Sequence, residues 1–383
     1  MPALVFDEPA VARTAQLAGT EPRVNWFLEL TRPEAVEGRR IVNDLYSRFP
    51  DDNGRMKANL RSSDEKRLFT ALDELLVHDL LLSGYRLDYE EGEGTRPDFR
   101  LYDQDDGSYV AAVEVVTLFL RNDWNAEERR HAELQDALNA RLRLSTHSVM
   151  FEVRRWDATP SVKHMAKWIG ETIDELRSDP SVLPVDAFGI QKKVYSTRVV
   201  DIVVDFWPLI PGAVVGESRN VVLGGAAVGG WVDSNLRLRE RLDEKAAKYD
   251  LRGKPLAIVV GVRDPMCDVG EVHQALVGSE EVVVATLESR RKGDGFFGRW
   301  GDRRVAKREH VSAVFSVHEW FPGGPYRPRI TRFDNPLAAA PFPTDALSVD
   351  GHWGATERGP THVRADWLVR PGPPIPVGMT SDR

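Results

Sequence analysis

The sequence predicts an α/β protein with a mixed central sheet flanked by helices. One observation is a leucine-rich helical stripe that is followed by three short strand-like segments. A second is the run PLAIVVGV at 255–262, which is apolar on both faces and therefore typical of a central, buried strand. With 383 residues, 42% of them hydrophobic, the chain is long enough to bury a substantial core.

The first helix of this pattern is predicted from Asp64. Leucines at 68, 72, 75, 76 and 80 form its apolar stripe, and Gly84 ends it. The segments YRLDYE (85–90), PDFRLYD (97–103) and SYVAAVEVV (108–116) follow as strands. The turn DQDDGS joins the last two strands into a hairpin.

A second helix, from about Asn125 to Leu144, and a fourth strand, SVMFEV (148–153), come next. The order helix, three strands, helix, strand predicts a mixed sheet with helices packed on it. Later patterns predict helices at 161–178 and 234–250, and strands at 198–207, 255–262, 281–287 and 311–317. We expect one α/β domain over 61–320 with an insertion at about 158–235. An N-terminal extension (1–60) without assigned elements and a Pro-, Gly- and Arg-rich C-terminal extension (321–383) would flank it.

The composition places the chain in a broad class. The net charge of -8 argues against a protein that coats nucleic acid over its whole surface, although it leaves room for a local basic groove. A single cysteine, Cys267, permits no intrachain disulfide and favours a reducing compartment. The N-terminus lacks a basic-then-apolar signal pattern, and no apolar run approaches the ~20 residues that span a bilayer. We therefore expect a cytoplasmic protein without a membrane partner.

Glu114 stands out because it lies inside an apolar strand, on the face that it shares with Ala112 and Val116. An unpaired carboxylate is costly there, and a neighbouring cation removes that cost. Asp98 opens the partner strand of the hairpin, so its carboxylate can reach the same cation. Two carboxylates and a backbone carbonyl, which we assign to Val115, suit a hard ion such as Mg²⁺ or Mn²⁺.

These residues carry a family resemblance. The stretch RPDF, the hairpin and VEVV, preceded by a helix, resemble the PD-(D/E)XK nuclease superfamily, which has the restriction-endonuclease-like fold. The stretch from about 64 to 153, roughly a quarter of the chain, carries the resemblance. It implies a metal-dependent nuclease in which Asp98 and Glu114 hold the metal. Many members add a glutamate from the first helix, and Glu74 in ALDELL matches it.

The chain departs from the superfamily pattern at one position. The superfamily's lysine lies two residues after the glutamate, where this chain has Val116. A lysine from another element can replace it, and the helix at 234–250 offers Lys245 at the edge of its apolar stripe. Lys248 lies further round the same helix and is the second candidate. A lysine that faces a core needs a partner, which the carboxylates or a phosphate would supply.

Structural explanations compete with each of these assignments. Glu114 can pair with an arginine such as Arg100, and Asp98 can be a strand-start residue. Asp79 competes with Glu74 for the role of the helix acid. Lys245 can extend its ammonium past the apolar stripe to water.

Two further features are open to both kinds of interpretation. His78 lies one helical turn after Glu74, which suits a surface pair as well as a ligand. The stretch RRKGDGFFGRWGDRR (290–304) interleaves Phe296, Phe297 and Trp300 with arginines, as in single-strand binding sites, although an anchored surface loop explains it slightly better. Motifs for nucleotide phosphates, serine hydrolases and zinc sites are missing from the sequence.

The function that these patterns favour is a metal-dependent endonuclease that hydrolyses DNA, in defence against foreign DNA or in repair. The residues expected to act are Glu74, Asp98, Glu114 and Lys245 or Lys248, with Mg²⁺ or Mn²⁺ as cofactor. The alternative is a catalytically inactive, nuclease-like subunit that binds nucleic acid or protein. A homodimer and a complex with a partner protein are both compatible with either function.

Overall fold

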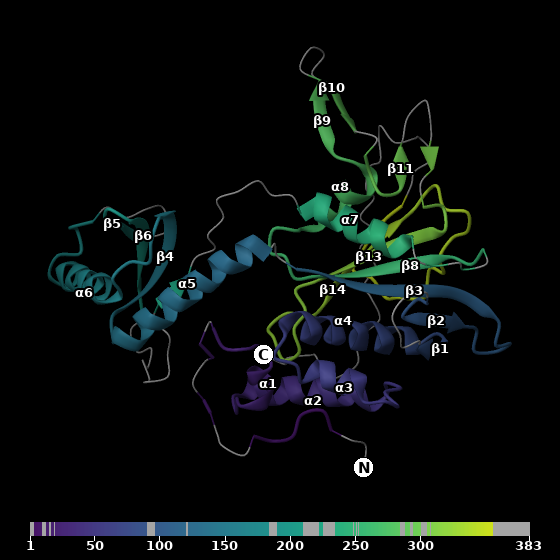
Figure 1. Cartoon of the computed structure of the whole chain (residues 1–383), viewed down its shortest axis with the longest axis horizontal. Helices are drawn as coiled ribbons and strands as arrows, with labels where there is room; N and C mark the ends of the chain where they lie inside the picture. The colour runs from purple at the N-terminus through teal and green to yellow at the C-terminus, as the bar shows by residue number, and fades with distance from the viewer. Residues whose placement is uncertain are drawn as a thin grey trace. The chain divides into compact units, whose positions relative to one another are not determined.

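The computed structural model divides the chain into two compact units (Figure 1). The first unit comprises Met1–Glu8, Pro33–Leu120 and Val232–Arg383, and the second comprises Pro9–Arg32 and Arg121–Trp231. The structure describes residues 4–9, 13–14, 17–18, 20–89, 96–119, 122–183, 190–209, 222–224, 234–247, 249, 251, 253–283, 288–291, 294–299, 305–306 and 308–354.

The described chain begins with helices, mixes helices and strands in its middle and ends with strands. The helices are α1 (Asn25–Leu28), α2 (Pro33–Ser47), α3 (Arg55–Leu60), α4 (Glu65–Leu82), α5 (Asn122–Arg141), α6 (Val162–Ser178), α7 (Ser234–Ala246) and α8 (Val269–Val277). The strands are β1 (Arg86–Tyr89), β2 (Phe99–Tyr102), β3 (Tyr109–Leu118), β4 (His147–Trp156), β5 (Gln191–Ser196), β6 (Val200–Pro208), β7 (Val222–Gly224), β8 (Leu256–Val262), β9 (Glu280–Val283), β10 (Glu288–Arg291), β11 (Gly298–Arg299), β12 (Val305–Ala306), β13 (Val311–His318), β14 (Arg329–Asp334) and β15 (Gly351–Trp353).

A seven-stranded mixed sheet forms the centre of the first unit, in the order β1-β2-β3-β8-β13-β14-β15. β1, β2 and β3 are antiparallel neighbours, whereas β3, β8 and β13 run parallel to one another. The expected α/β class with a mixed central sheet is therefore confirmed. β8, the PLAIVVGV strand, is buried along its whole length in the middle of the sheet, as its two-sided apolar pattern predicted.

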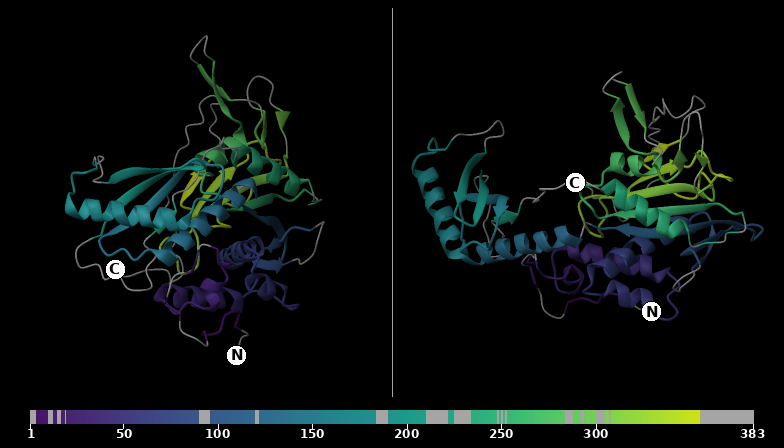
Figure 2. Two further views of the ribbon diagram at one scale, coloured as in Figure 1. Left: turned by 60° about the vertical axis from the view of Figure 1, so that its left-hand side comes forward. Right: turned by 45° about the horizontal axis from the view of Figure 1, so that its top comes forward.

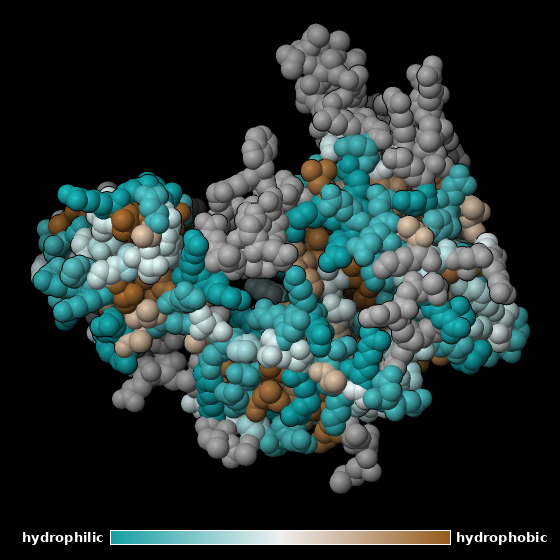
Figure 3. Space-filling view, viewed as in Figure 1, coloured by the Kyte–Doolittle hydropathy of each residue, from teal (hydrophilic) through white to brown (hydrophobic). Residues whose placement is uncertain are grey.

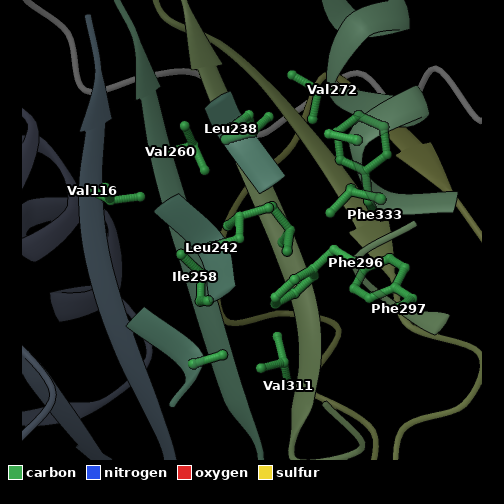
Figure 4. Close-up of a cluster of buried hydrophobic side chains, with 14 of the residues drawn as sticks. Val116, Leu238, Leu242, Ile258, Val260, Val272, Phe296, Phe297, Val311 and Phe333 are labelled. Carbon is green, nitrogen blue, oxygen red and sulfur yellow. The ribbon is translucent and has the colours of Figure 1, made fainter. Parts of the chain in front are cut away.

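Helices cover both faces of this sheet (Figure 2). On one face lies α4, which begins where the Asp64 side chain caps the amide of Lys66. This helix buries four of the five leucines of the predicted stripe, and the fifth, Leu80, is half-buried. On the other face, α7 and α8 bury Leu238, Leu242 and Val272 against the sheet (Figure 4). Because alternate residues of a strand point to opposite faces, β3 presents Ala112, Glu114 and Val116 towards α7 and the odd-numbered residues towards α4.

The second unit has its own four-stranded sheet, in the order β5-β6-β4-β7. Its core combines α5 and α6 with one face of that sheet. The expectation that the helix after 125 and the strand at 148–153 continue the sheet of Glu114 was therefore wrong. These segments are α5 and β4 of the second unit, and α7 and β8 continue the first sheet instead. The inserted chain starts at Arg121, whereas the sequence suggested an insertion from about 158.

Other expectations also changed. The N-terminal 60 residues contain α1, α2 and α3, whose polar residues obscured the apolar stripe. The chain after Trp320 supplies the strands β14 and β15 to the main sheet, while 355–383 lie outside the described residues.

Hydrophilic side chains cover most of the described surface in Figure 3. Among the helices that the structure describes, none is both long enough and apolar enough to cross a membrane.

Candidate active site

The candidate site lies where β2 separates from β3. The antiparallel ladder runs from Tyr102 to Phe99, which pairs with Val113, so Asp98 stands opposite Glu114 at the end of the ladder. The Asp98 carboxylate accepts a hydrogen bond from the Val115 amide at 2.7 Å, and the Asp98 amide donates to Glu114 Oε2 at 3.3 Å. The hairpin therefore fixes the two carboxylates against each other, as its sequence suggested.

Glu114 is almost completely buried, with 1% of its side chain exposed. Its Oε1 atom accepts a hydrogen bond from the Lys245 ammonium of α7, which forms an ion pair with it. The Tyr249 hydroxyl, just beyond the end of α7, also donates to Glu114. A strand, a loop and a helix end thus converge on one carboxylate and hold it in a fixed orientation.

Glu74 approaches the same place from α4, on the opposite face of the sheet. Its Oε2 atom accepts a hydrogen bond from the Tyr89 hydroxyl of β1 at 3.2 Å. Burial raises the pKa of Glu74 to about 7, and the charge of Glu114 adds to this effect, while Tyr89 and Lys245 oppose it. The helix acid is therefore poised to gain or lose a proton near neutral pH.

The site holds more carboxyl groups than one lysine can neutralise. Burial raises the pKa of Asp98 well above its usual range, and the charges of Glu114 and Glu74 raise it further. Burial alone would lower the pKa of Lys245, but the three carboxylates outweigh it, so the pKa of Lys245 is raised. Three carboxyl groups around one ammonium make a site that a further cation would stabilise.

The backbone of Val115 points towards the opening between β2 and β3. On β3, the Ala112 amide donates to the Pro255 carbonyl at 3.0 Å, and the Leu118 carbonyl accepts from the Arg263 amide at 2.8 Å. Even-numbered residues of β3 therefore bond to the β8 side, and odd-numbered residues face β2. The Val115 carbonyl consequently points past the end of the β2 ladder, on the side where Asp98 lies.

The residues that compete for the same role have different surroundings in the structure. Asp79 pairs with Arg48 at 2.7 Å, whereas Glu74 faces the site. His78 is buried between Phe49 and Phe99, where burial lowers its pKa to about 4, so it does not form a surface pair with Glu74.

The other residues singled out in the sequence are paired, buried in the core or outside the described part of the chain. The carboxylate of Glu114 pairs with Lys245 in α7. Lys248 and Trp300 lie outside the described residues. Phe296 and Phe297 are each only 1% exposed and belong to the core beneath α7 and α8, so they are unavailable for stacking on bases. The part of the 290–304 stretch at 294–299 is therefore anchored in the core by Phe296 and Phe297.

Two tyrosines of the site were missed in the sequence. Tyr249 lies within the helix predicted at 234–250 and Tyr89 within a predicted strand, and the sequence assigned neither of them to the site. A tyrosine that follows a lysine by four positions on a helix does share its face. That signal could have placed Tyr249 beside Lys245, but no local pattern links Tyr89 to Glu74.

Within the described part of the chain, no three His, Cys, Asp or Glu side chains are grouped so that they could hold a metal ion. The donors that fit a hard divalent ion are instead two carboxylates, Asp98 and Glu114, with the Val115 carbonyl beside them. Burial and the neighbouring carboxyl groups raise the pKa of Asp98, and a bound divalent cation would oppose that rise. Comparison with models of known protein families, with curated proteins and with solved structures found no match.

Proposed function

We propose that the chain is a metal-dependent endonuclease that hydrolyses phosphodiester bonds of DNA. The observation that carries the proposal is the convergence of Asp98, Glu114 and Lys245 at the point where β2 separates from β3, with Glu74 opposite. A buried acidic pair with its own lysine is expensive to maintain. Functional sites are where such arrangements are usual.

The order of the elements supports the resemblance to the PD-(D/E)XK superfamily. In the first unit, α4, β1, β2, β3, α7 and β8 follow one another, with the second unit inserted between β3 and α7. Their order is helix, three strands, helix, strand, and all four strands belong to the same sheet. Glu74 lies on the first helix, Asp98 before the second strand and Glu114 on the third, which are the places that the resemblance assigns to them.

Each residue has a distinct proposed role. Asp98, Glu114 and the Val115 carbonyl would hold Mg²⁺ or Mn²⁺, which when bound supplies charge neutralisation at the phosphate and an acidified water. Lys245 replaces the lysine that the superfamily has at the position of Val116. Its ammonium orients water and stabilises negative charge on the phosphate. Glu74, with its pKa of about 7, accepts or donates a proton beside the site.

A cleavage assay tests this proposal. Wild type and Glu114→Gln are compared on supercoiled plasmid, linear duplex, single-stranded DNA and RNA, each with Mg²⁺, Mn²⁺ or EDTA. We expect wild type to cut a DNA substrate with either metal, and neither EDTA-treated wild type nor Glu114→Gln to cut. Cutting by Glu114→Gln at the wild-type rate would contradict the proposal, as would cleavage in EDTA. Preference for RNA would correct the substrate class and keep the site.

The same contacts favour a second candidate function. Lys245 already neutralises Glu114, and Val116 occupies the usual lysine position, as in a nuclease-like subunit that binds nucleic acid or protein without cutting it. Calorimetry with Mn²⁺ separates the two functions. A folded wild-type protein that binds no Mn²⁺ and cuts nothing would be the inactive subunit.

A further inference from the structure

The end of α7 decides where Lys245 lies. Lys245 is the penultimate residue of this helix, within the last turn. Helix ends leave four carbonyl groups without partners inside the helix, and they fray unless another group binds them. A frayed last turn would release the Lys245 ammonium from Glu114, so the contacts that hold this turn also control the site.

His310 binds that helix end. Its Nε2 atom lies 2.9 Å from the carbonyl oxygen of Ala246, the residue directly after Lys245. Because a carbonyl only accepts hydrogen bonds, Nε2 carries the proton and donates it. The histidine thus occupies one of the carbonyls that would otherwise be solvated, on the residue adjacent to the lysine.

The chain around His310 is itself fixed to the core. The His310 carbonyl accepts a hydrogen bond from the Leu256 amide at 3.0 Å, at the start of β8. The next residue, Val311, begins β13, and its carbonyl accepts from the buried Asn335 amide group at 2.8 Å. The imidazole is therefore carried by a turn that is bonded to the central sheet.

Arg308 adds a second contact from the same turn. Its Nε atom donates to Asp243 Oδ1 at 3.0 Å, in the last turn of α7. Arg308 has a φ of 54°, in the left-handed region that few residues other than glycine adopt. The turn holds this unfavourable conformation while the side chains of Arg308 and His310 reach the helix end.

We propose that His310 is a positioning residue for Lys245. By binding the Ala246 carbonyl it keeps the last turn of α7 helical and holds the Lys245 ammonium against Glu114. The part that concerns cleavage rests on the proposed nuclease function, whereas the position of Lys245 can be measured without any substrate. The sequence gives no sign of this role, because His310 lies 65 residues after Lys245 in the printed sequence.

Two variants separate the hydrogen bond from the packing of the ring. His310→Phe keeps a ring but removes the donor, and His310→Gln keeps a donor but removes the ring. His352→Phe, at a histidine that pairs with Asp334 in another part of the first unit, is the matched control. Thermal unfolding of each variant identifies those that are folded at the assay temperature.

The first readout is the rate at which dilute acetic anhydride acetylates Lys245 in the metal-free protein, followed by mass spectrometry. We expect the rate to rise several-fold in His310→Phe and to stay near the wild-type value in His310→Gln and His352→Phe. A wild-type rate in folded His310→Phe would overturn the proposal, and so would an equal rise in His310→Gln.

The second readout is single-turnover cleavage with saturating Mn²⁺. We expect His310→Phe to lose between about 10- and 100-fold in rate at an unchanged substrate KM, with recovery in His310→Gln. Wild-type cleavage by His310→Phe together with faster acetylation would contradict a role in positioning for catalysis. If wild type itself does not cut, the proposed function fails, and the acetylation rates still decide the role of His310.

Discussion

The Lys245 ammonium of α7 forms an ion pair with the Glu114 carboxylate of β3, 131 positions away in the sequence. Removing one partner of a buried pair leaves the other charge without compensation. Lys245→Met should therefore lower the free energy of unfolding in EDTA by about 3 kcal/mol at neutral pH. The free energy of unfolding lost in the Glu114→Gln/Lys245→Met double variant should be smaller than the sum of the losses in the two single variants.

Urea unfolding of the four proteins measures this coupling. Glu240→Gln, at an exposed position of the same helix, is the control and should change stability by less than about 0.5 kcal/mol. Additive effects of the two site substitutions would show that the pair contributes no coupling energy. That result would remove the electrostatic basis of the site.

Glu74 should make stability depend on pH. Its pKa is about 7 in the folded protein and near 4.5 in an unfolded chain, so the folded state binds the proton more tightly. Its contribution to stability is fully present below about pH 4.5 and is lost as the pH rises through about 7. Glu74→Gln should remove this contribution, so that the free energy of unfolding changes by about 1–3 kcal/mol less across that pH range than in wild type.

Unfolding in EDTA between pH 4.5 and 8 provides the comparison, with Glu240→Gln again as the control. Parallel profiles for wild type and Glu74→Gln would mean that Glu74 titrates normally. The raised pKa, and with it the proposed proton transfer by Glu74, would then be wrong.

Metal binding should release protons. The pKa of Asp98 is raised well above its usual range by burial and by neighbouring carboxylates, and a bound divalent cation requires the ionised form. The affinity for Mn²⁺ should consequently rise with pH, by up to about tenfold per pH unit for each proton displaced. Calorimetry in two buffers with different ionisation enthalpies counts those protons. Binding without proton release at neutral pH would contradict the raised pKa of Asp98.

Gly261 should be intolerant of a side chain. A Cβ atom at this position would lie 1.8 Å from Asp73 Oδ2. Asp73 is buried, accepts a hydrogen bond from Thr117 at 2.8 Å and pairs with Arg263, so it cannot move without breaking these contacts. We expect Gly261→Ala to lower the free energy of unfolding by about 3 kcal/mol.

Gly84→Ala is the matched control, because a Cβ atom there meets nothing within 4 Å. Its effect should stay within about 0.5 kcal/mol. Equal stability of the two variants in urea would show that α4 can move away from β8 at little cost. The close approach of Asp73 to the strand would then be unimportant for the fold.

Much of the candidate site could be predicted from local patterns. The hairpin sequence brought Asp98 and Glu114 together, because a short turn fixes which residues of two strands are opposite. The apolar stripe of the later helix indicated Lys245, because a lysine beside buried leucines needs a partner. Glu74 followed only from the family resemblance, which implies a glutamate on the first helix.

The rest depended on contacts between distant segments. α5 and β4 have the periodicities of a helix and a strand, which do not specify the sheet to which each belongs. The contacts of Tyr89 with Glu74 and of His310 with α7 join separate elements, so no spacing along the chain encodes them. Phe296 and Phe297 lie in a basic stretch that resembles a binding loop, and only the packing beneath α7 and α8 reveals them as core residues.

The most direct test of the proposed function is the Mn²⁺-dependent cleavage of DNA by Lys245→Met beside Glu240→Gln, the exposed α7 position that serves as control. We expect Lys245→Met to bind Mn²⁺ but to lose cleavage by about 100-fold or more, while Glu240→Gln cuts at nearly the wild-type rate. Cleavage by Lys245→Met at the wild-type rate would contradict the claim that the ammonium beside Glu114 replaces the lysine missing at Val116.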